Sequence, residues 1–153
     1  GHHRKTVSTG ISHDTKTSTC NRTINLYMTT QYFTLRTTLP TLNQYINAER
    51  SSKYYAASLK RKATHGLWAE LMSHKPVLVT APVSIAYRWY RRDRKTDKDN
   101  IAATGMKFVQ DALIKADVIS NDGWSNIDNF THQWHVDPVD PRLVLTVTET
   151  EPT

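Results

Sequence analysis

The sequence predicts an α+β domain with a mixed, mostly antiparallel sheet of about four strands and two main helices. Short segments that alternate apolar and polar residues predict the strands, because side chains alternate between the two faces of a sheet. Two longer segments repeat apolar residues at helical spacing and predict the helices. No internal repeat interrupts this pattern.

The first half of the chain is predicted to form a strand, a turn and a helix. Residues 31–37 alternate Tyr, Phe and Leu with Thr and Arg, which is typical of a strand. Pro40 cannot donate to a β-ladder, so we expect residues 39–45 to turn the chain and residues 47–50 to form a loop. A helix should follow, capped by Ser51 or Ser52 and running to about Ser73. Its apolar residues recur at mostly four-residue spacing: Ala56, Leu59, Ala63, Leu67 and Leu71.

The second half is predicted to contain three strands and a helix. Residues 77–89 contain two apolar segments, 77–79 and 83–89, which we expect to form one long strand. The following helix has a competent N-cap in Asp99 or Asn100, and a wide apolar arc on one side. On its other side, Asn100, Thr104, Lys107 and Asp111 form a narrow polar stripe. Strands at about 127–136 and 143–148 follow, separated by the proline-containing turn 137–141.

Composition limits the domain organisation and the location of the protein. The chain of 153 residues fits a single domain, for which we assign residues 28–153. Residues 1–27 are polar and rich in Thr and Ser, and we expect them to be a poorly ordered segment derived from a tag or vector. The alternative is a native basic arm that touches DNA. Cys20 is the only cysteine, which excludes a disulfide framework and a Cys-based zinc site.

The sequence contains no apolar segment long enough to cross a membrane and no recognisable signal peptide, so we expect a cytoplasmic protein without a membrane partner. The net charge is +6, and it is unevenly distributed. A basic cluster between residues 88 and 98 predicts contact with a polyanion. Its six cations are the expected DNA-binding residues: Arg88, Arg91, Arg92, Arg94, Lys95 and Lys98.

Two carboxylates follow this basic cluster. Asp97 and Asp99 are two positions apart, so in an extended segment their side chains would point the same way. Asp122 is a third candidate, in the loop after the second helix. Converging carboxylates bind hard divalent cations such as Mg²⁺, which activate water and stabilise a phosphodiester leaving group. The alternative is that Asp97 and Asp99 only cap the helix and interact with its positive end.

Other candidate residues have simpler explanations. Lys107 could stabilise a phosphoryl group, or it could be a helix lysine paired with Asp111 four residues later. His132 and His135 are three positions apart on a strand, so their rings should point to opposite faces, and we assign them as strand-surface residues. A calcium-binding EF-hand loop starting at Asp97 fits poorly, because Ala102 replaces the required glycine.

Several of these motifs together resemble the RusA family of Holliday junction resolvases. They are Asp97-Lys98-Asp99-Asn100, Lys107 followed by Asp111-Ala112-Leu113, Asn121-Asp122, and the early segment Leu39-Pro40-Thr41-Leu42-Asn43-Gln44-Tyr45. The resemblance spans about residues 33–147. It implies a homodimeric, Mg²⁺-dependent endonuclease, often encoded by phages or prophages, that cuts four-way DNA junctions by paired nicks. Mn²⁺ is expected to substitute for Mg²⁺.

The resemblance also implies roles for individual residues. Asp97, Asp99 and Asp122 match the metal-binding acids of the family, and Lys107 matches its catalytic lysine. Two departures are present: many members have Asp-Asp in place of Asn121-Asp122, and about three residues are extra between Asp99 and Lys107. Two other functions share these features. One is a catalytically inactive protein that binds junctions or other DNA, and the other is a nuclease for other branched DNA.

Overall fold

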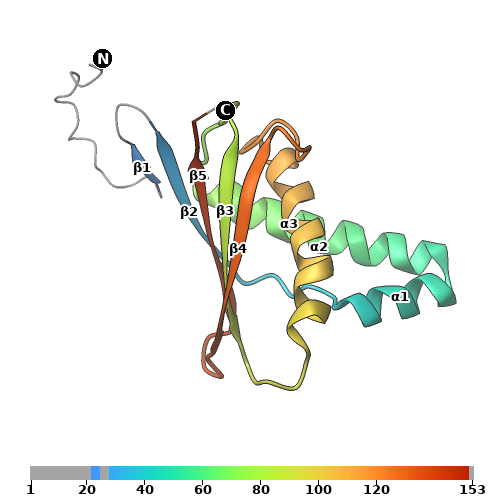
Figure 1. The fold of residues 1–153 in the computed structure, drawn as a ribbon. Helices are drawn as coiled ribbons and strands as arrows, with labels where there is room; N and C mark the ends of the chain where they lie inside the picture. Colours follow the sequence, from blue (N-terminus) through green and yellow to red (C-terminus); the bar gives the residue numbers. More distant parts are fainter. Residues whose placement is uncertain (1–21, 25–27, 152–153) are drawn as a thin grey trace, which may run out of the picture.

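The computed structural model describes residues 22–24 and 28–151 as a five-stranded sheet with three helices (Figure 1). The strands are β1 (Arg22–Ile24), β2 (Thr29–Leu35), β3 (Val83–Arg91), β4 (Ile127–Val136) and β5 (Arg142–Glu149). The helices are α1 (Leu42–Ser51), α2 (Lys53–Ser73) and α3 (Lys98–Lys115). The strand order in the sheet is β1-β2-β5-β3-β4.

The sheet is mixed and mostly antiparallel, which confirms the predicted α+β class. β5 lies between β2 and β3 and is antiparallel to both, whereas β3 and β4 are parallel. Parallel neighbours need a crossover connection, and α3 supplies it. As a result, β3 and β4 start at the same end of the sheet, with Val83 opposite Ile127. The short β1 belongs to residues 1–27, the segment that we expected to be derived from a tag or vector, and it pairs with β2. The other residues of that segment lie outside the described part of the chain.

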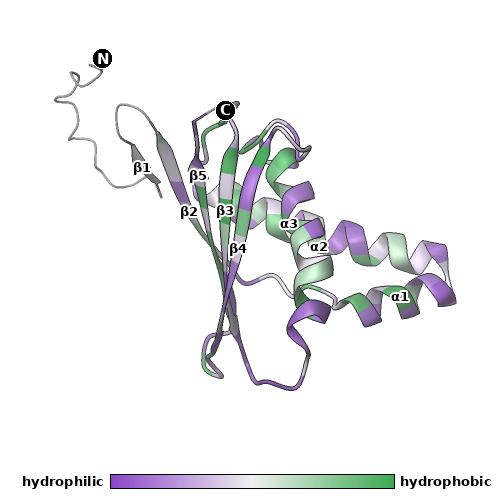
Figure 2. Cartoon of the chain, viewed as in Figure 1, coloured by the Kyte–Doolittle hydropathy of each residue, from purple (hydrophilic) through white to green (hydrophobic). Residues whose placement is uncertain are grey.

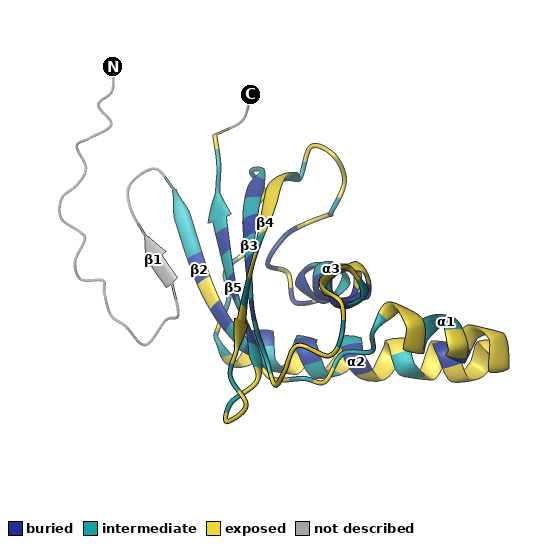
Figure 3. Ribbon diagram, turned by 60° about the horizontal axis from the view of Figure 1, so that its bottom comes forward, coloured by how far each residue is buried: buried dark blue, intermediate teal, exposed yellow. Residues whose placement is uncertain are grey.

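α2 and α3 pack on one face of the sheet, as Figures 1 and 3 show. β2, β3 and β5 alternate buried residues with more exposed ones, and the buried ones face these helices. Phe33, Tyr87 and Leu145 are among the fully buried residues contributed by three neighbouring strands, and Phe108 is one contributed by α3. In Figure 2, hydrophilic residues lie along the loop after β3 and where α1 joins α2, away from the sheet.

Most element boundaries agree with the sequence predictions. α2 begins after Ser52, whose hydroxyl accepts hydrogen bonds from the backbone N–H groups of Tyr54 and Tyr55, as expected for its cap. The prediction of a turn and loop over residues 39–50 was wrong, because residues 42–51 form α1. Thr41 and Gln44 form a capping box there, and they stabilise a helix whose only buried residue is Ala48.

The prediction that residues 77–89 form one strand was also wrong. Val79 makes only an isolated parallel bridge to Ile119, and the chain bends before β3 begins at Val83. Pro82 lacks an N–H and cannot extend the ladder. Residue 77 is instead held by Gln31, which is 1% exposed. The amide of this side chain donates to the Val77 carbonyl and accepts from the Val77 N–H, both at 2.9 Å.

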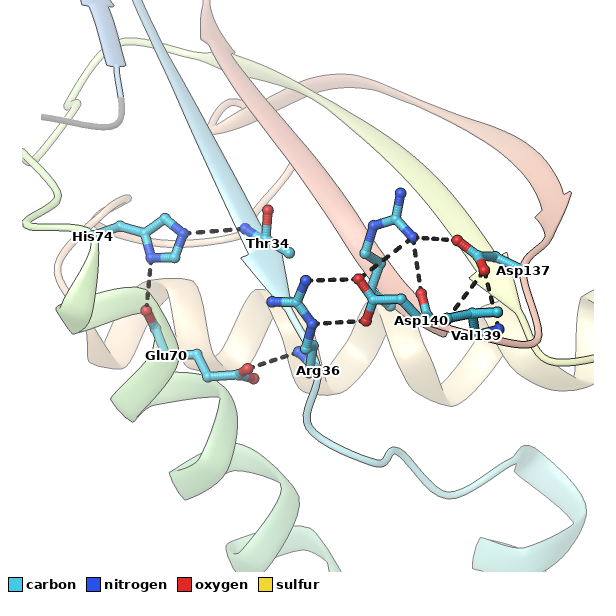
Figure 4. Close-up of polar contacts among 8 residues, drawn as sticks. Thr34, Arg36, Glu70, His74, Asp137, Val139 and Asp140 are labelled. Atoms are coloured by element: carbon cyan, nitrogen blue, oxygen red, sulfur yellow. Dashed lines mark hydrogen bonds and ion pairs between the residues drawn. The ribbon is translucent and has the colours of Figure 1, made fainter. Parts of the chain in front are cut away.

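Polar side chains fasten β2 to α2 and to the β4–β5 turn (Figure 4). The Glu70 carboxylate accepts hydrogen bonds from the backbone N–H groups of Arg36 and Thr37, at 2.7 and 2.9 Å. The Arg36 guanidinium makes a bidentate pair with Asp140, and its hydrogen bond lowers the pKa of that carboxyl group. Arg142 likewise lowers the pKa of Asp137 by donating a hydrogen bond at 2.8 Å. These contacts position the end of the sheet where β3 enters the basic cluster.

Candidate functional site

Asp97 and Asp99 lie at the start of α3, directly after the loop that follows β3. Asp97 is the N-cap residue, with φ −63° and ψ 145°, and it makes no capping hydrogen bond through its side chain. Asp99 belongs to the first helical turn. The expectation that both lie in an extended segment was therefore wrong, as was the N-cap assignment, because α3 begins at Lys98. The two residues nevertheless line the same pocket.

This pocket, which we call the acidic pocket, has a volume of about 900 Å³ and opens between the β3–α3 loop and the end of β4. Besides the two acids, its lining residues are Arg91, Asp93, Arg94, Thr96, Lys98, Ile101, Trp134, His135 and Val136. Within the described residues, neither the Asp97 nor the Asp99 carboxylate has a hydrogen bond or an ion pair. Both are exposed, so their oxygens are free to bind a cation or water.

The start of α3 is fixed by contacts with the segment that leads into α1. The Asn100 side-chain oxygen accepts a hydrogen bond from the backbone N–H of Asn43 at 2.9 Å. The buried Thr104 hydroxyl donates to the Pro40 carbonyl at 2.6 Å. The predicted polar stripe of α3 therefore packs partly against this segment. The two acids sit on a helix end that is fixed at two points.

Five of the six predicted DNA-binding residues lie around the β3–α3 loop, and Arg88 lies apart from them. Arg91, Arg94 and Lys98 line the acidic pocket, and Arg92 and Lys95 join Arg91 around a second pocket of about 550 Å³ beside the same loop. Arg88 alternates with the buried Tyr87 and Trp89, so it lies on the sheet face away from the helices. It is therefore separated from the other five.

Arg91 is a half-buried cation between the two pockets. Burial lowers the pKa of its guanidinium, and the nearby Asp93 carboxylate partly opposes this effect. An arginine side chain stays charged in proteins, so the lowered pKa reports incomplete solvation rather than loss of charge. No carboxylate among the described residues forms an ion pair with it. An anionic group entering either pocket would supply the missing partner.

Lys107 lies eight residues after Asp99, about 12 Å further along the helix axis. Its ammonium group is 3.4 Å from Asp111, which is also 4.0 Å from the ammonium of Lys60 on α2. Lys107 thus makes the ion pair with Asp111, four residues later, that the sequence offered as the alternative to a catalytic role. It does not line the acidic pocket.

Asp122 lies at the opposite end of α3. It lines a different pocket, of about 800 Å³, beside the start of β4 and the side chains of Trp124 and Phe130. The 18 residues of α3 extend over about 27 Å between the two ends. One chain therefore does not bring Asp122 to Asp97 and Asp99. Consistently, the described residues contain no group of three or more His, Cys, Asp or Glu side chains that could hold one metal ion.

The two histidines of β4 have different environments. His135 is exposed as expected, but it stacks on Tyr90 and lines the acidic pocket, which the sequence analysis missed. His132 was wrongly assigned to the surface: it is half-buried and accepts a hydrogen bond from the Trp89 indole N–H at 2.8 Å. Burial lowers its pKa. The alternation of Phe130, His132 and Trp134 on one face of the strand indicated this burial.

Comparisons with known proteins do not assign the chain to a family. A scan against models of protein families gave no match, and a search of curated proteins gave none either. Among the described residues, no helix has the length and apolar character needed to cross a membrane. The structural basis for a functional proposal is therefore the acidic pocket with its surrounding cations.

Proposed function

We propose that this protein is a Mg²⁺-dependent, structure-specific DNA endonuclease that resolves four-way junctions. The observation that carries the proposal is the acidic pocket. In it, two unpaired carboxylates lie beside three cationic side chains, Arg91, Arg94 and Lys98. Carboxylates suit a hard divalent cation, and cations suit the phosphodiester backbone. The motifs shared with the RusA family support the same class of reaction and add the four-way junction as substrate.

The residues present fit a bound Mg²⁺ ion. Asp97 and Asp99 supply oxygen ligands from an anchored helix end, and Mg²⁺ usually keeps several waters besides one or two carboxylates. When bound, the ion would lower the pKa of a water molecule and stabilise the leaving oxygen. Arg94 and Lys98 would hold the flanking phosphates, so DNA is recognised through its backbone and shape.

A homodimer fits the expected substrate. A four-way junction has approximate two-fold symmetry, and a dimer with two-fold symmetry presents two equivalent sites to it. Paired nicks on opposing strands then need one site from each copy. The bacterial cytoplasm, in a phage-infected or prophage-carrying host, is the proposed location.

The test is cleavage of a synthetic mobile four-way junction with Mg²⁺, beside linear duplex and flap substrates. We expect symmetric nicks in the junction with the wild-type protein and none with Asp99→Asn. Asp99→Asn should keep or increase junction binding, because it removes a negative charge next to phosphate. Glu49→Gln, which neutralises an exposed acid on α1, is the matched control and should cut normally. Equal cutting by wild type and Asp99→Asn would reject the site.

A second candidate is a catalytically inactive protein that binds DNA junctions. The observations that favour it are the distance of Asp122 from the acidic pocket and the ion pair of Lys107 with Asp111. It predicts tight junction binding with no nicks under any divalent cation. Cutting of the flap in preference to the junction would instead indicate a nuclease for other branched DNA.

A further inference from the structure

α1 and the first half of α2 project away from the sheet, as Figures 1 and 3 show. We call residues 42–62 the helical arm. Its two helices contact each other, and within it only Ala48 and Ala56 are buried. Neither alanine belongs to the main hydrophobic core. The helical arm contributes little to the core, so most of its surface is available to a partner.

The helical arm is basic. Its only acid is Glu49, and the next Asp or Glu in the sequence is Glu70. Lys60 lies 4.0 Å from the Asp111 carboxylate. The other four cations are exposed and form no ion pair among the described residues, and we call them the arm cations: Arg50, Lys53, Arg61 and Lys62. Cations without acidic partners on a projecting element predict a polyanionic partner.

Two exposed tyrosines lie among these cations. Tyr54 and Tyr55, at the start of α2, are 77% and 55% exposed. Arg61 and Lys62 follow them by seven residues, which is nearly two helical turns, so each tyrosine shares a line along α2 with one cation. Both lines lie away from the side of α2 that buries Ala56. The outer side of the helical arm therefore presents phenolic hydroxyl groups together with positive charges.

The base of the helical arm lies beside the proposed site. The backbone N–H of Asn43 donates to Asn100 at the start of α3, and Gln44 lines the pocket that also contains Arg92 and Lys95. The ten residues of α1 extend over about 15 Å, so the tip lies about that far from the base. Phosphates along one DNA strand are about 3.4 Å apart, so this length corresponds to about four or five of them.

The exposed residues of the helical arm favour DNA over a membrane surface. A helix that lies on a membrane buries an apolar face, usually of Leu, Phe or Trp side chains, below the headgroups. Between residues 43 and 62 no Leu, Ile, Val, Met, Phe or Trp is exposed. The DNA backbone requires no apolar face, because cations and hydroxyl donors such as tyrosine bind it.

We propose that the helical arm holds a duplex of the junction by its sugar–phosphate backbone. The arm cations bind phosphates along this duplex. Tyr54 and Tyr55 contact the backbone at the tip, about four or five phosphates beyond the acidic pocket. The choice of DNA as the partner rests on the proposed function, whereas the exposed positive charge of the helical arm does not. The contact fixes the direction in which a duplex leaves the acidic pocket.

The charge contact is tested by junction binding without divalent cations, measured by fluorescence anisotropy over a range of salt. Arg50→Gln with Lys53→Gln, which we call the tip variant, should reduce the slope of log affinity against log salt by about 2, since each phosphate contact contributes about 0.9. Lys75→Gln with Lys115→Gln removes the same charge where α2 and α3 finish and should keep the wild-type slope. Equal slopes for these two variants would overturn the contact.

Tyr54→Ala with Tyr55→Ala separates the tyrosine contacts from the charge. A neutral contact releases no counterion, so affinity should fall about tenfold at every salt concentration while the slope stays the same. Tyr32→Ala, at a tyrosine that is 38% exposed on β2, should bind like wild type. Wild-type affinity in the double variant would contradict the role of both tyrosines.

Uncharged phosphates locate the tip on the DNA. In an immobile junction, methylphosphonates at about the fourth and fifth phosphates from the crossover in all four duplexes should weaken binding by wild type. They should not weaken binding by the tip variant, which has already lost this contact. Equal weakening of both proteins would place the tip elsewhere.

Failure of this contact and failure of the nuclease give different results. A wild type whose salt slope falls in the tip variant, but which never cuts, would reject the nuclease and keep the contact. A wild type that cuts junctions, with an unchanged slope in the tip variant, would keep the nuclease and overturn the contact. Binding to phosphatidylserine vesicles that is lost in the tip variant, with junction binding unchanged, would replace DNA by a membrane surface as the partner.

Discussion

At the scale of single residues, the environment of His132 defines its protonation state. The Trp89 indole N–H donates to Nδ1 at 2.8 Å, so Nδ1 carries no proton. The neutral ring then carries its proton on Nε2, which points at the Met106 sulfur. The ring also stacks on Tyr87, with centroids 4.9 Å apart. Protonation of Nδ1 would remove its acceptor lone pair and place a charge among these apolar groups.

We therefore predict that the protein loses stability as the pH falls below about 6.5. Burial lowers the pKa of His132, so near and below this pH the unfolded chain binds a proton that the folded chain does not. The free energy of unfolding should be fully retained above the pKa that His132 has in the unfolded chain. It should decrease as the pH falls from there through the lower pKa that His132 has in the folded chain. Urea unfolding at about pH 7.5 and 5.5 measures this loss. His132→Gln should show a smaller loss than wild type; an equal loss in both would assign the effect to other groups.

At the scale of elements, α3 approaches β3 closely at one glycine. A Cβ atom at Gly105 would lie 2.6 Å from Cη2 of Trp89 and 3.2 Å from Cζ3. The indole is 3% exposed and is held by its hydrogen bond to His132, so it has little freedom to move. Only a residue without a side chain lets the helix lie at this distance from the strand.

Gly105→Ala should therefore destabilise the protein, although alanine favours a helix by about 1 kcal/mol over glycine. Overpacking of a buried contact costs about 1–3 kcal/mol, so after the gain in helix propensity we expect a net loss of up to about 2 kcal/mol in the free energy of unfolding. Gly123→Ala is the control, because its nearest contact is 3.5 Å away. Urea denaturation of both variants measures the difference. A Gly105→Ala variant as stable as wild type would mean that the indole shifts freely.

The elements were more predictable from the sequence than their arrangement. The periodicity of α2, α3 and β5 is strong because each has one buried face, and their positions were predicted to within a few residues. α1 was missed because it buries only Ala48 and depends on its capping box. Asp97 and Asp99 line one pocket, but the extended segment predicted for them was wrong, because the helix begins between the two residues. To predict where Asp122 lies, one must know that β3 and β4 are parallel, and local sequence patterns do not determine this pairing.

At the scale of the whole molecule, the cations are concentrated at one end of the sheet. The loop after β3 and the start of α3 carry Arg91, Arg92, Arg94, Lys95 and Lys98. Arg88 is separated from them on the open sheet face, and the opposite end is acidic. A nucleic acid approaching the basic end would release counterions there, and binding should weaken as salt is added. The slope of this salt dependence reports how many phosphates are neutralised.

We predict that Arg94→Gln with Lys98→Gln reduces the slope of log affinity against log salt by about 2, since each phosphate contact contributes about 0.9. Both residues line the acidic pocket. The matched control is Lys75→Gln with Lys115→Gln, which removes two cations at the end where α2 and α3 finish. Junction binding without divalent cations, measured by fluorescence anisotropy over a range of salt, gives each slope. If the control lowers the slope as much as the pocket variant, binding follows net charge, and the acidic pocket is not where the DNA backbone lies.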